Sequence, residues 1–289
     1  MKRKTYSIAG LKVLLTGARS IQQVANLPGF DVFETNDQSE TNIDIFIHLD
    51  QDVDVAYLSE ICHIYCFKVL DIEHSFSICK EGYLYEMRQQ NGCKIVSIIY
   101  SPYGNKVYMS SCSCEMYIKY AMWIAFSLPM IREKVLPIHA STIVKDQEAV
   151  LFLGESGTGK STHTRLWLQY IENTYLLNDD SPLLRVKNDK IFVCGSPWSG
   201  KTHCYRQEII PLKAVVRLRQ YPENKISRSD KLNSIGIIYP SFPPFLAYDV
   251  LFSEKMIQIT DSILKETPVY ELKCLPNKQA AEIASSIIY

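Results

Sequence analysis

One feature narrows the choice of folds more than any other: a glycine loop of nine residues that fills the pattern G-x-x-x-x-G-K-[ST] completely. Its residues are Gly154, Glu155, Ser156, Gly157, Thr158, Gly159, Lys160, Ser161 and Thr162. Small residues let consecutive backbone N–H groups curl around a phosphate, the lysine reaches the outer phosphoryl oxygens, and the serine hydroxyl can bind Mg²⁺. The loop therefore predicts a nucleotide site within an α/β fold.

The residues on either side of the loop have the pattern that such a site requires. An apolar run at 148–153 predicts a strand that ends at the loop. The spacing of Leu166, Trp167 and Tyr170 predicts a helix from Thr162 to Tyr170. Strand, glycine loop and helix in this order favour a nucleotide-binding unit over a chance match.

Composition and charge exclude several other partners. The chain is 47% hydrophobic and 21% charged, which is typical of a globular protein with an ample core. Because Lys+Arg and Asp+Glu both number 31, no bulk field attracts nucleic acid or an anionic membrane. The longest apolar run, 121–130, is too short to span a bilayer. We therefore expect no nucleic-acid partner and no membrane partner.

The nine cysteines are irregularly spaced, which suits a reducing, cytoplasmic compartment better than a disulfide framework. Cys62 with His63 and Cys66, or Cys112 with Cys114, can be drawn as zinc ligands. Neither group has the usual spacing matched by a second pair downstream, so the pattern favours buried thiols.

The character of the chain changes near residue 110, which predicts two domains, 1–110 and 111–289. The first half is expected to be a mostly β accessory domain with a hairpin at 95–110. It contains no group of residues whose types and spacing indicate a catalytic site. Its predicted strands are 11–15, 43–49, 58–67, 95–100 and 106–110. The second half opens with an amphipathic helix over 115–133, kinked at Pro129, and a strand over 136–144.

An acidic pair, Asp179-Asp180, ends a short predicted strand about twenty residues after the lysine of the loop. Phosphoryl transfer needs a metal near the phosphates and a group that accepts the proton of the attacking hydroxyl, and two adjacent carboxylates serve both needs. The alternative is an ordinary capped turn, because Asn-Asp-Asp-Ser-Pro is also good turn composition. Downstream of a phosphate loop, the pair favours the catalytic interpretation.

His139 precedes the loop on the strand that is expected to form a hairpin with the strand entering it. A lone histidine on an apolar strand is more often a hydrogen-bonded core residue than a catalyst. Its predicted position near the phosphates keeps the catalytic interpretation open.

Together, residues 138–141, 149–162 and 176–180 resemble the HPr kinase/phosphorylase family, which has the phosphoenolpyruvate-carboxykinase-like P-loop fold, an α/β fold with a mixed sheet. The resemblance covers residues 135–220 well, the tail loosely and residues 1–110 not at all. It implies ATP and Mg²⁺ as cofactors, with residues 154–162 around the phosphates.

Carried over by position, the resemblance also implies roles for single residues. Lys160 would contact the β- and γ-phosphates, and Ser161 and Asp180 would hold Mg²⁺. Asp179 would be the general base on an acceptor hydroxyl, and His139 would lie at the phosphate site. The related family often assembles, so a homo-oligomer is possible.

A second glycine turn, 195–201, stands where that family has its substrate-recognition segment. Lys201 could add positive charge at the transferring phosphoryl group, and Trp198 could flank an acceptor or a base. The alternative is a plain turn with an exposed lysine. This departure argues against HPr itself as the substrate.

The sequence therefore predicts an ATP-dependent kinase that phosphorylates a serine-type hydroxyl of a peptide, small protein or small molecule. Three alternatives stay open: a nucleotide sensor with little turnover, phosphorolysis of a phosphoserine, and an activity of the phosphoenolpyruvate-carboxykinase type.

Overall fold

The computed structural model describes residues 2–37, 39, 41–53, 58–69 and 71–289. The chain divides into two compact units. The first comprises Met1–Glu133 with Tyr248–Val250, and the second comprises Lys134–Ala247 with Leu251–Tyr289.

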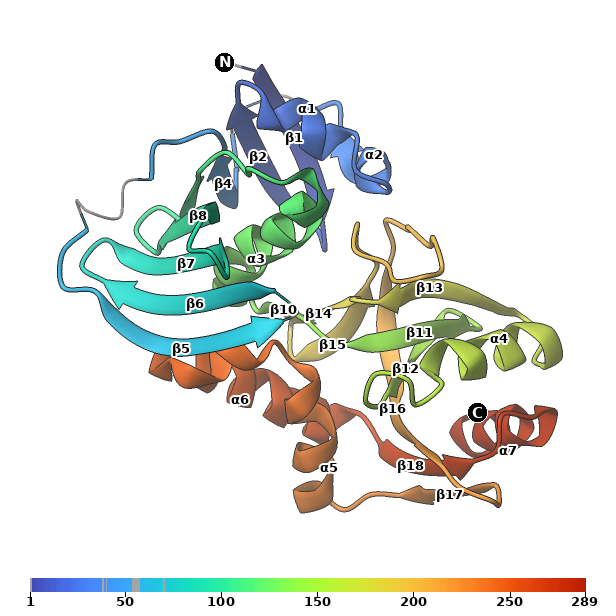
Figure 1. Ribbon diagram of the computed structural model, residues 1–289. Helices are drawn as coiled ribbons and strands as arrows, with labels where there is room; N and C mark the ends of the chain where they lie inside the picture. The colour runs from blue at the N-terminus through green and yellow to red at the C-terminus, as the bar shows by residue number, and fades with distance from the viewer. Residues whose placement is uncertain (1, 38, 40, 54–57, 70) are drawn as a thin grey trace. The chain divides into compact units, whose positions relative to one another are not determined.

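The first unit is a nine-stranded mixed sheet with the order β3-β1-β2-β4-β9-β8-β7-β6-β5 (Figure 1). Its strands are β1 (Lys2–Ile8), β2 (Leu11–Gly17), β3 (Glu34–Thr35), β4 (Ile45–His48), β5 (Cys62–Val69), β6 (Ile72–Cys79), β7 (Gly82–Gln89), β8 (Lys94–Ser101) and β9 (Lys106–Met109). Among the strands that the structure describes here, the β2–β4 and β4–β9 pairs are parallel and the others are antiparallel. The expected hairpin at 95–110 is confirmed by the antiparallel pairing of β8 with β9.

The α-helices in the described part of this unit are α1 (Ser20–Ala25), α2 (Phe30–Phe33) and α3 (Ile118–Met130). A chain of edge-to-face aromatic contacts joins α2 and α3 to the sheet, from Tyr6 of β1 through Phe30 of α2 to Phe126 of α3. Because α3 buries its apolar face against β8, β9 and β4, residues 111–133 belong to the first unit. The structure thus draws the boundary after Glu133, whereas the sequence places it near residue 110.

The second unit is built on another mixed sheet, with the path β10-β14-β15-β16-β12-β11-β13 and with β18 joined to β16 and β17. Its strands are β10 (Val135–Pro137), β11 (Ala140–Lys145), β12 (Glu148–Leu153), β13 (Thr174–Asp180), β14 (Leu183–Lys187), β15 (Lys190–Cys194), β16 (Ile209–Gln220), β17 (Lys225–Arg228) and β18 (Val269–Cys274). Its helices are α4 (Lys160–Tyr170), α5 (Lys231–Ile238), α6 (Val250–Glu266) and α7 (Lys278–Ile288). Strands β12, β16 and β18 run parallel, and the other pairs are antiparallel.

Alternation along β16 separates the two faces of this sheet. Val216 and Leu218 point into a core that contains Trp167 of α4 and Ala284 of α7, and the two helices lie against each other (Figure 1). Successive side chains of a strand point to opposite faces, so Arg217 is directed to the other side. The same strand therefore contributes apolar side chains to the core on one face and a positively charged side chain on the opposite face.

The topology brings the three sequence signals to one edge of the sheet. Strand β12 ends at Leu153, immediately before the glycine loop, and β11 begins at Ala140 as its antiparallel neighbour. Strand β13 pairs with β11 so that Asp180 lies opposite Ala140. His139, the loop and the acidic pair are consequently neighbours in space although they lie far apart in the sequence.

The predicted continuous strand over 136–144 is wrong. The backbone leaves the sheet between β10 and β11, where the N–H of Ile138 donates to the carbonyl of Pro182 and the N–H of His139 donates to that of Ser241 at 2.8 Å. This break places His139 outside the strand ladder.

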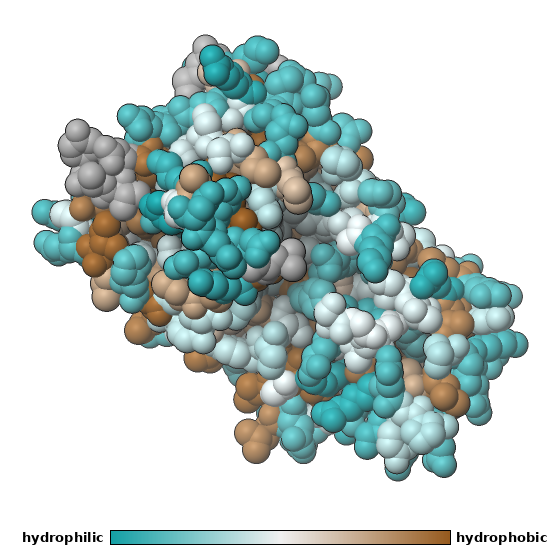
Figure 2. All heavy atoms as spheres, viewed as in Figure 1, coloured by the Kyte–Doolittle hydropathy of each residue, from teal (hydrophilic) through white to brown (hydrophobic). Residues whose placement is uncertain are grey.

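Hydrophilic side chains predominate on the face of the molecule shown in Figure 2, and hydrophobic ones are scattered among them. Isolated exposed apolar residues such as Met116 and Leu232 are ordinary on protein surfaces. Within the part of the chain that the structure describes, no helix has the length and apolar character needed to cross a membrane.

Candidate functional site

The glycine loop follows β12 directly, and its last three residues, from Lys160 to Thr162, form the start of α4. Three of its glycines have positive φ: Gly154 at 154°, Gly157 at 81° and Gly159 at 102°. At Gly154 a side chain is also excluded by space, because a Cβ atom there would lie 2.7 Å from the hydroxyl of Thr158. Glycine thus lets the backbone fold back at the end of the strand.

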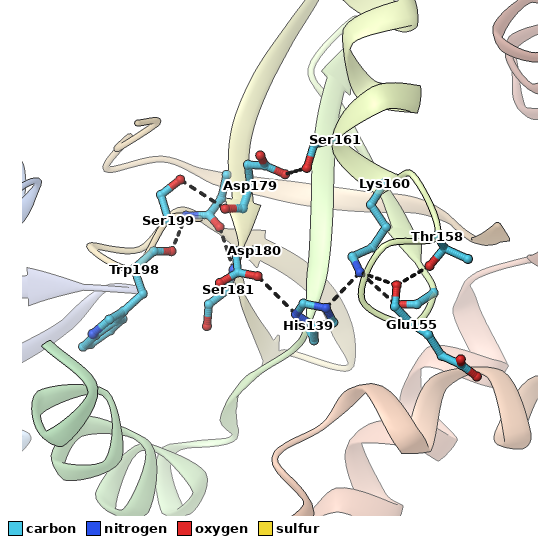
Figure 3. A network of polar contacts seen from close by, with 12 residues as sticks. His139, Glu155, Thr158, Lys160, Ser161, Asp179, Asp180, Ser181, Trp198 and Ser199 are labelled. Carbon is cyan, nitrogen blue, oxygen red and sulfur yellow. Dashed lines mark hydrogen bonds and ion pairs between the residues drawn. The ribbon is translucent and has the colours of Figure 1, made fainter. Parts of the chain in front are cut away.

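Lys160 lies inside the curve of this loop and is only 9% exposed. Its Nζ donates to the carbonyl oxygens of Gly154 at 2.8 Å and Glu155 at 3.2 Å, and to Nε2 of His139 at 2.8 Å (Figure 3). Burial lowers the pKa of Lys160, and the nearby carboxylates of Asp180 and Asp179 act in the opposite direction. All three ammonium protons have partners, so an arriving anion has to replace at least one of them.

His139 bridges this lysine to the acidic pair. Its Nδ1 lies 3.3 Å from Oδ1 of Asp180. Because a lysine ammonium only donates, the contact with Nε2 fits the imidazole tautomer that carries its proton on Nδ1, directed at the carboxylate. The structure brings Asp180, His139 and Lys160 into one chain of polar contacts, as Figure 3 shows.

The other member of the acidic pair points elsewhere. Asp179 is 3% exposed, and its Oδ1 accepts a 3.0 Å hydrogen bond from the hydroxyl of Ser161. The Asp180 side chain, in contrast, is 50% exposed. The sequence-based assignment pairs Ser161 with Asp180, whereas the structure pairs Ser161 with Asp179 and gives Asp180 to His139.

The second glycine turn, 195–201, packs against the backbone of the acidic pair. The N–H of Gly200 donates to the carbonyl of Asp179 at 2.5 Å, and Asp180 forms an isolated β-bridge with Ser199. A Cβ atom on Gly200 would lie 3.1 Å from Cβ of Asp180. Asp180 itself has φ of 124°, a conformation that non-glycine residues rarely adopt, so the turn helps to hold a strained residue at the site.

Sequence reasoning missed Asn178, which ties the turn to the strand. This fully buried side chain donates from Nδ2 to the carbonyl of Trp198 at 3.1 Å and to the hydroxyl of Ser196 at 3.2 Å. Its Oδ1 accepts from the N–H of Ser181. A buried amide beside two aspartates at a strand end is the signal that could have identified it, since buried polar groups need partners.

The two residues singled out on this turn have different environments. Trp198 is only 5% exposed, and the expectation that it flanks an acceptor or a base stays a prediction. Lys201 is exposed, and among the described residues its ammonium forms no ion pair or hydrogen bond. Its proposed contact with a phosphoryl group stays a prediction.

A cavity of about 710 Å³ lies beside the start of α4. Its lining includes Thr162, Leu166, Tyr221 and Pro276, together with the backbone of Gly159. The size and the mixture of aromatic, aliphatic and backbone groups are typical of small-molecule sites.

The donor set was tested against Mg²⁺. Within the described ranges, no group of three or more His, Cys, Asp or Glu side chains is arranged to hold a metal ion. Mg²⁺ usually takes one or two protein oxygens and completes its shell with water and substrate phosphates. The Ser161 hydroxyl and the Asp179 carboxylate, 3.0 Å apart at the mouth of the loop, fit that requirement.

The cysteines drawn as zinc ligands form no such group in the part of the chain that the structure describes. All nine cysteines are free thiols. Burial raises the pKa of Cys194 to about 12 and also raises the pKa of Cys112. Cys62 and Cys66 are exposed, so the expectation of buried thiols does not hold for that pair.

Fold and site together define a mixed α/β protein with a strand–glycine loop–helix unit and a lysine–histidine–aspartate cluster at one sheet edge. No protein-family model matches the chain, and no curated protein matches it. Among solved structures, the chain is similar to the Hpr(Ser) kinase/phosphatase from Coxiella burnetii, at 13% identity and a TM-score of 0.30. The match covers 53% of this chain and 93% of that one.

Proposed function

We propose that this protein is an ATP-dependent phosphotransferase that moves the γ-phosphoryl group to a serine-type hydroxyl on a peptide, small protein or small molecule. The observation that carries the proposal is the convergence of Lys160, Ser161 and the two carboxylates of Asp179 and Asp180 at the mouth of one glycine loop. Phosphoryl transfer depends on positioning and on charge stabilisation, and these residues supply both.

The nucleotide phosphates would lie on the backbone N–H groups of residues 154–162, at the start of α4, where the helix dipole favours an anion. The nucleoside would occupy the 710 Å³ cavity, whose lining begins at the same loop with Gly157 and Gly159 and continues to Tyr221. Lys160 would exchange its contact with His139 for a phosphoryl oxygen.

The two carboxylates would have separate roles. Ser161 and Asp179 are the residues that would hold Mg²⁺, which neutralises charge on the phosphates when it is bound. Asp180, whose side chain is half exposed and whose Oδ1 lies 3.3 Å from Nδ1 of His139, would accept the proton of the acceptor hydroxyl. This division exchanges the two aspartate roles that the family resemblance implies.

Lys201 would add positive charge near the transferring group, since its ammonium has no partner among the described residues. We also propose a cytoplasmic location, because free thiols throughout a chain suit a reducing compartment.

The test is transfer from γ-labelled ATP to peptides and small molecules that carry hydroxyl groups, together with calorimetric titration of Mg·ATP. Lys160→Ala should weaken nucleotide binding at least tenfold and abolish transfer. Lys190→Ala, which removes an exposed lysine of β15, is the matched control and should change neither. Unchanged ATP affinity in Lys160→Ala would refute the nucleotide site.

The alternative of a nucleotide sensor predicts a different result from the same experiment. A sensor would bind Mg·ATP with the same dependence on Lys160 but would release no ADP with any acceptor. The His139–Asp180 contact favours turnover, because nucleotide binding alone does not require a carboxylate positioned by a histidine.

A further inference from the structure

A second polar cavity, of about 540 Å³, lies on the face of β16, β17 and β18 that is opposite the core. Three arginines line it: Arg217 and Arg219 from β16, and Arg228 from the end of β17. The hydroxyl groups of Ser227 and Ser229 also belong to the lining. Nothing in the phosphotransfer mechanism above uses these residues.

The guanidinium group of Arg217 has too few hydrogen-bond and charge partners in this cavity. Its Nε is buried and has no hydrogen-bond partner, and a carboxylate oxygen of Glu155 lies 4.0 Å from Nη2. The Glu155 side chain is 87% exposed, so water screens that attraction. A buried guanidinium nitrogen without a partner is costly in the free protein and is satisfied when an acceptor oxygen arrives.

The acidic residues in the lining are already occupied. Glu271 accepts from Nε of Arg219 at 2.8 Å and lies 3.8 Å from the ammonium of Lys273. The carboxylate of Asp230 accepts from the backbone and the side-chain amide of Asn233, at 2.9 and 2.6 Å. The carboxylates of the lining therefore do not balance the positive charges of Arg217 and Arg228. Within the described residues the guanidinium of Arg228 forms no ion pair or hydrogen bond.

The lining of this cavity continues to the glycine loop. A smaller cavity of about 350 Å³ is lined by Arg217 and Arg219 together with residues 155–158 of the loop. The cavity assigned to the nucleoside shares Gly157, Thr158 and Leu218 with the same small cavity. The loop thus has an apolar cavity near its α4 end and an arginine-lined one reached through Glu155.

We propose that the arginine-lined cavity is the acceptor subsite and that it binds an anionic group, a carboxylate or a phosphate, on the molecule whose hydroxyl receives the phosphoryl group. This inference rests on the proposed phosphotransfer function. Arginine presents a planar fork of donors that matches both anions, and Arg217 with Arg228 supplies two such forks. The acceptor is accordingly a small hydroxy acid, a sugar phosphate or a peptide with an acidic residue beside its hydroxyl.

Calorimetric titration of inorganic phosphate and of malonate into protein saturated with Mg·ADP tests the subsite, because the nucleotide then occupies the loop. We expect one equivalent of at least one of the two anions to bind. Arg217→Gln and Arg228→Gln should each weaken that binding at least tenfold and change ADP affinity less than twofold. Lys231→Gln removes an exposed charge of α5 outside the lining and should leave anion binding unchanged.

Two results would overturn the subsite: neither anion binds to the ADP-loaded protein, or Arg217→Gln weakens ADP binding as much as anion binding, which would assign this arginine to the nucleotide phosphates. Arg228 is exposed, so its variant tests the subsite without disturbing the core. Titration of the same anions into nucleotide-free Lys160→Ala protein tests the subsite separately from the proposed function, because loss of ADP binding there leaves the arginine cavity intact.

Discussion

The Nζ atom of Lys160 lies 2.8 Å from Nε2 of His139, a residue 21 positions earlier in the chain. In the structure, then, the lysine of the glycine loop is shared between the loop carbonyls and a histidine whose other nitrogen faces Asp180. A phosphate that arrives at the loop competes with this histidine for the ammonium group. The contact therefore links nucleotide binding to the carboxylate that we assign to the acceptor.

His139→Ala should separate affinity from turnover. Removal of the imidazole frees one proton of Lys160, so Mg·ATP affinity should stay within about twofold of wild type or increase. The same change leaves Asp180 without its donor, and turnover should fall by on the order of 10²-fold, as for the loss of a general acid–base group. Calorimetry and labelled transfer measure the two quantities. A parallel loss of affinity and turnover would contradict the bridging role.

Asp179→Asn and Asp180→Asn should differ in their response to magnesium. Because Asp179 contacts Ser161, the first variant should lose most of the increase in ATP affinity that Mg²⁺ produces. Asp180→Asn should keep that increase and lose turnover. ATP titrations with and without Mg²⁺ measure the effect for each variant. The reverse pattern would restore the assignment implied by the family resemblance.

Gly200→Val should damage the site through its backbone. The added side chain would begin 3.1 Å from Cβ of Asp180 and 3.2 Å from the carbonyl oxygen of Asp179. We expect a loss of about 1–3 kcal/mol in the free energy of unfolding, together with reduced turnover. Gly236→Ala is the control: apart from its chain neighbours and the backbone of its own helix, no atom lies within 4 Å of its added Cβ. In helix α5 that change should stabilise by about 0.5–1 kcal/mol. Urea unfolding compares the two variants, and equal effects would refute the packing argument.

His163 should make stability depend on pH below neutrality. Burial lowers its pKa to about 4, and its Nε2 accepts from Nε1 of Trp167 at 3.1 Å. An unfolded histidine titrates near 6.5, so the folded state binds fewer protons below that pH. Its contribution to stability is complete above pH 6.5 and is lost as the pH falls toward 4. At pH 5 the loss amounts to on the order of 2 kcal/mol.

His163→Gln keeps an acceptor for the indole and removes the titration. Wild type should therefore lose about 2 kcal/mol more unfolding free energy than the variant between pH 7 and pH 5. His74, whose pKa burial lowers to about 4, is present in both proteins and cancels from the comparison. Urea unfolding at the two pH values provides the measurement, and equal losses would show that His163 is protonated in the folded state.

The local sequence pattern was sufficient to predict the strand and the helix on either side of the glycine loop. The strand at 148–153 and the helix that ends at Tyr170 are where periodicity predicts them, because apolar spacing and glycine positions are local properties. The strands β1, β6 and β7 of the first unit were not predicted. The same is true of the boundary after Glu133, which depends on where α3 buries its apolar face. No pattern within 111–133 specifies the sheet against which that helix packs.

For the candidate site, local pattern was enough to identify the residue types and to predict that His139, Lys160 and the acidic pair lie at the same end of neighbouring strands. The folded structure was needed to show that Asp179 faces Ser161 while Asp180 faces His139. The same holds for the burial of Trp198 and for the direction of Arg217 away from the core. The physical reason is that the direction of a side chain depends on backbone torsions and neighbouring packing. The φ of 124° at Asp180, stabilised by the turn around Gly200, is set by contacts between distant segments.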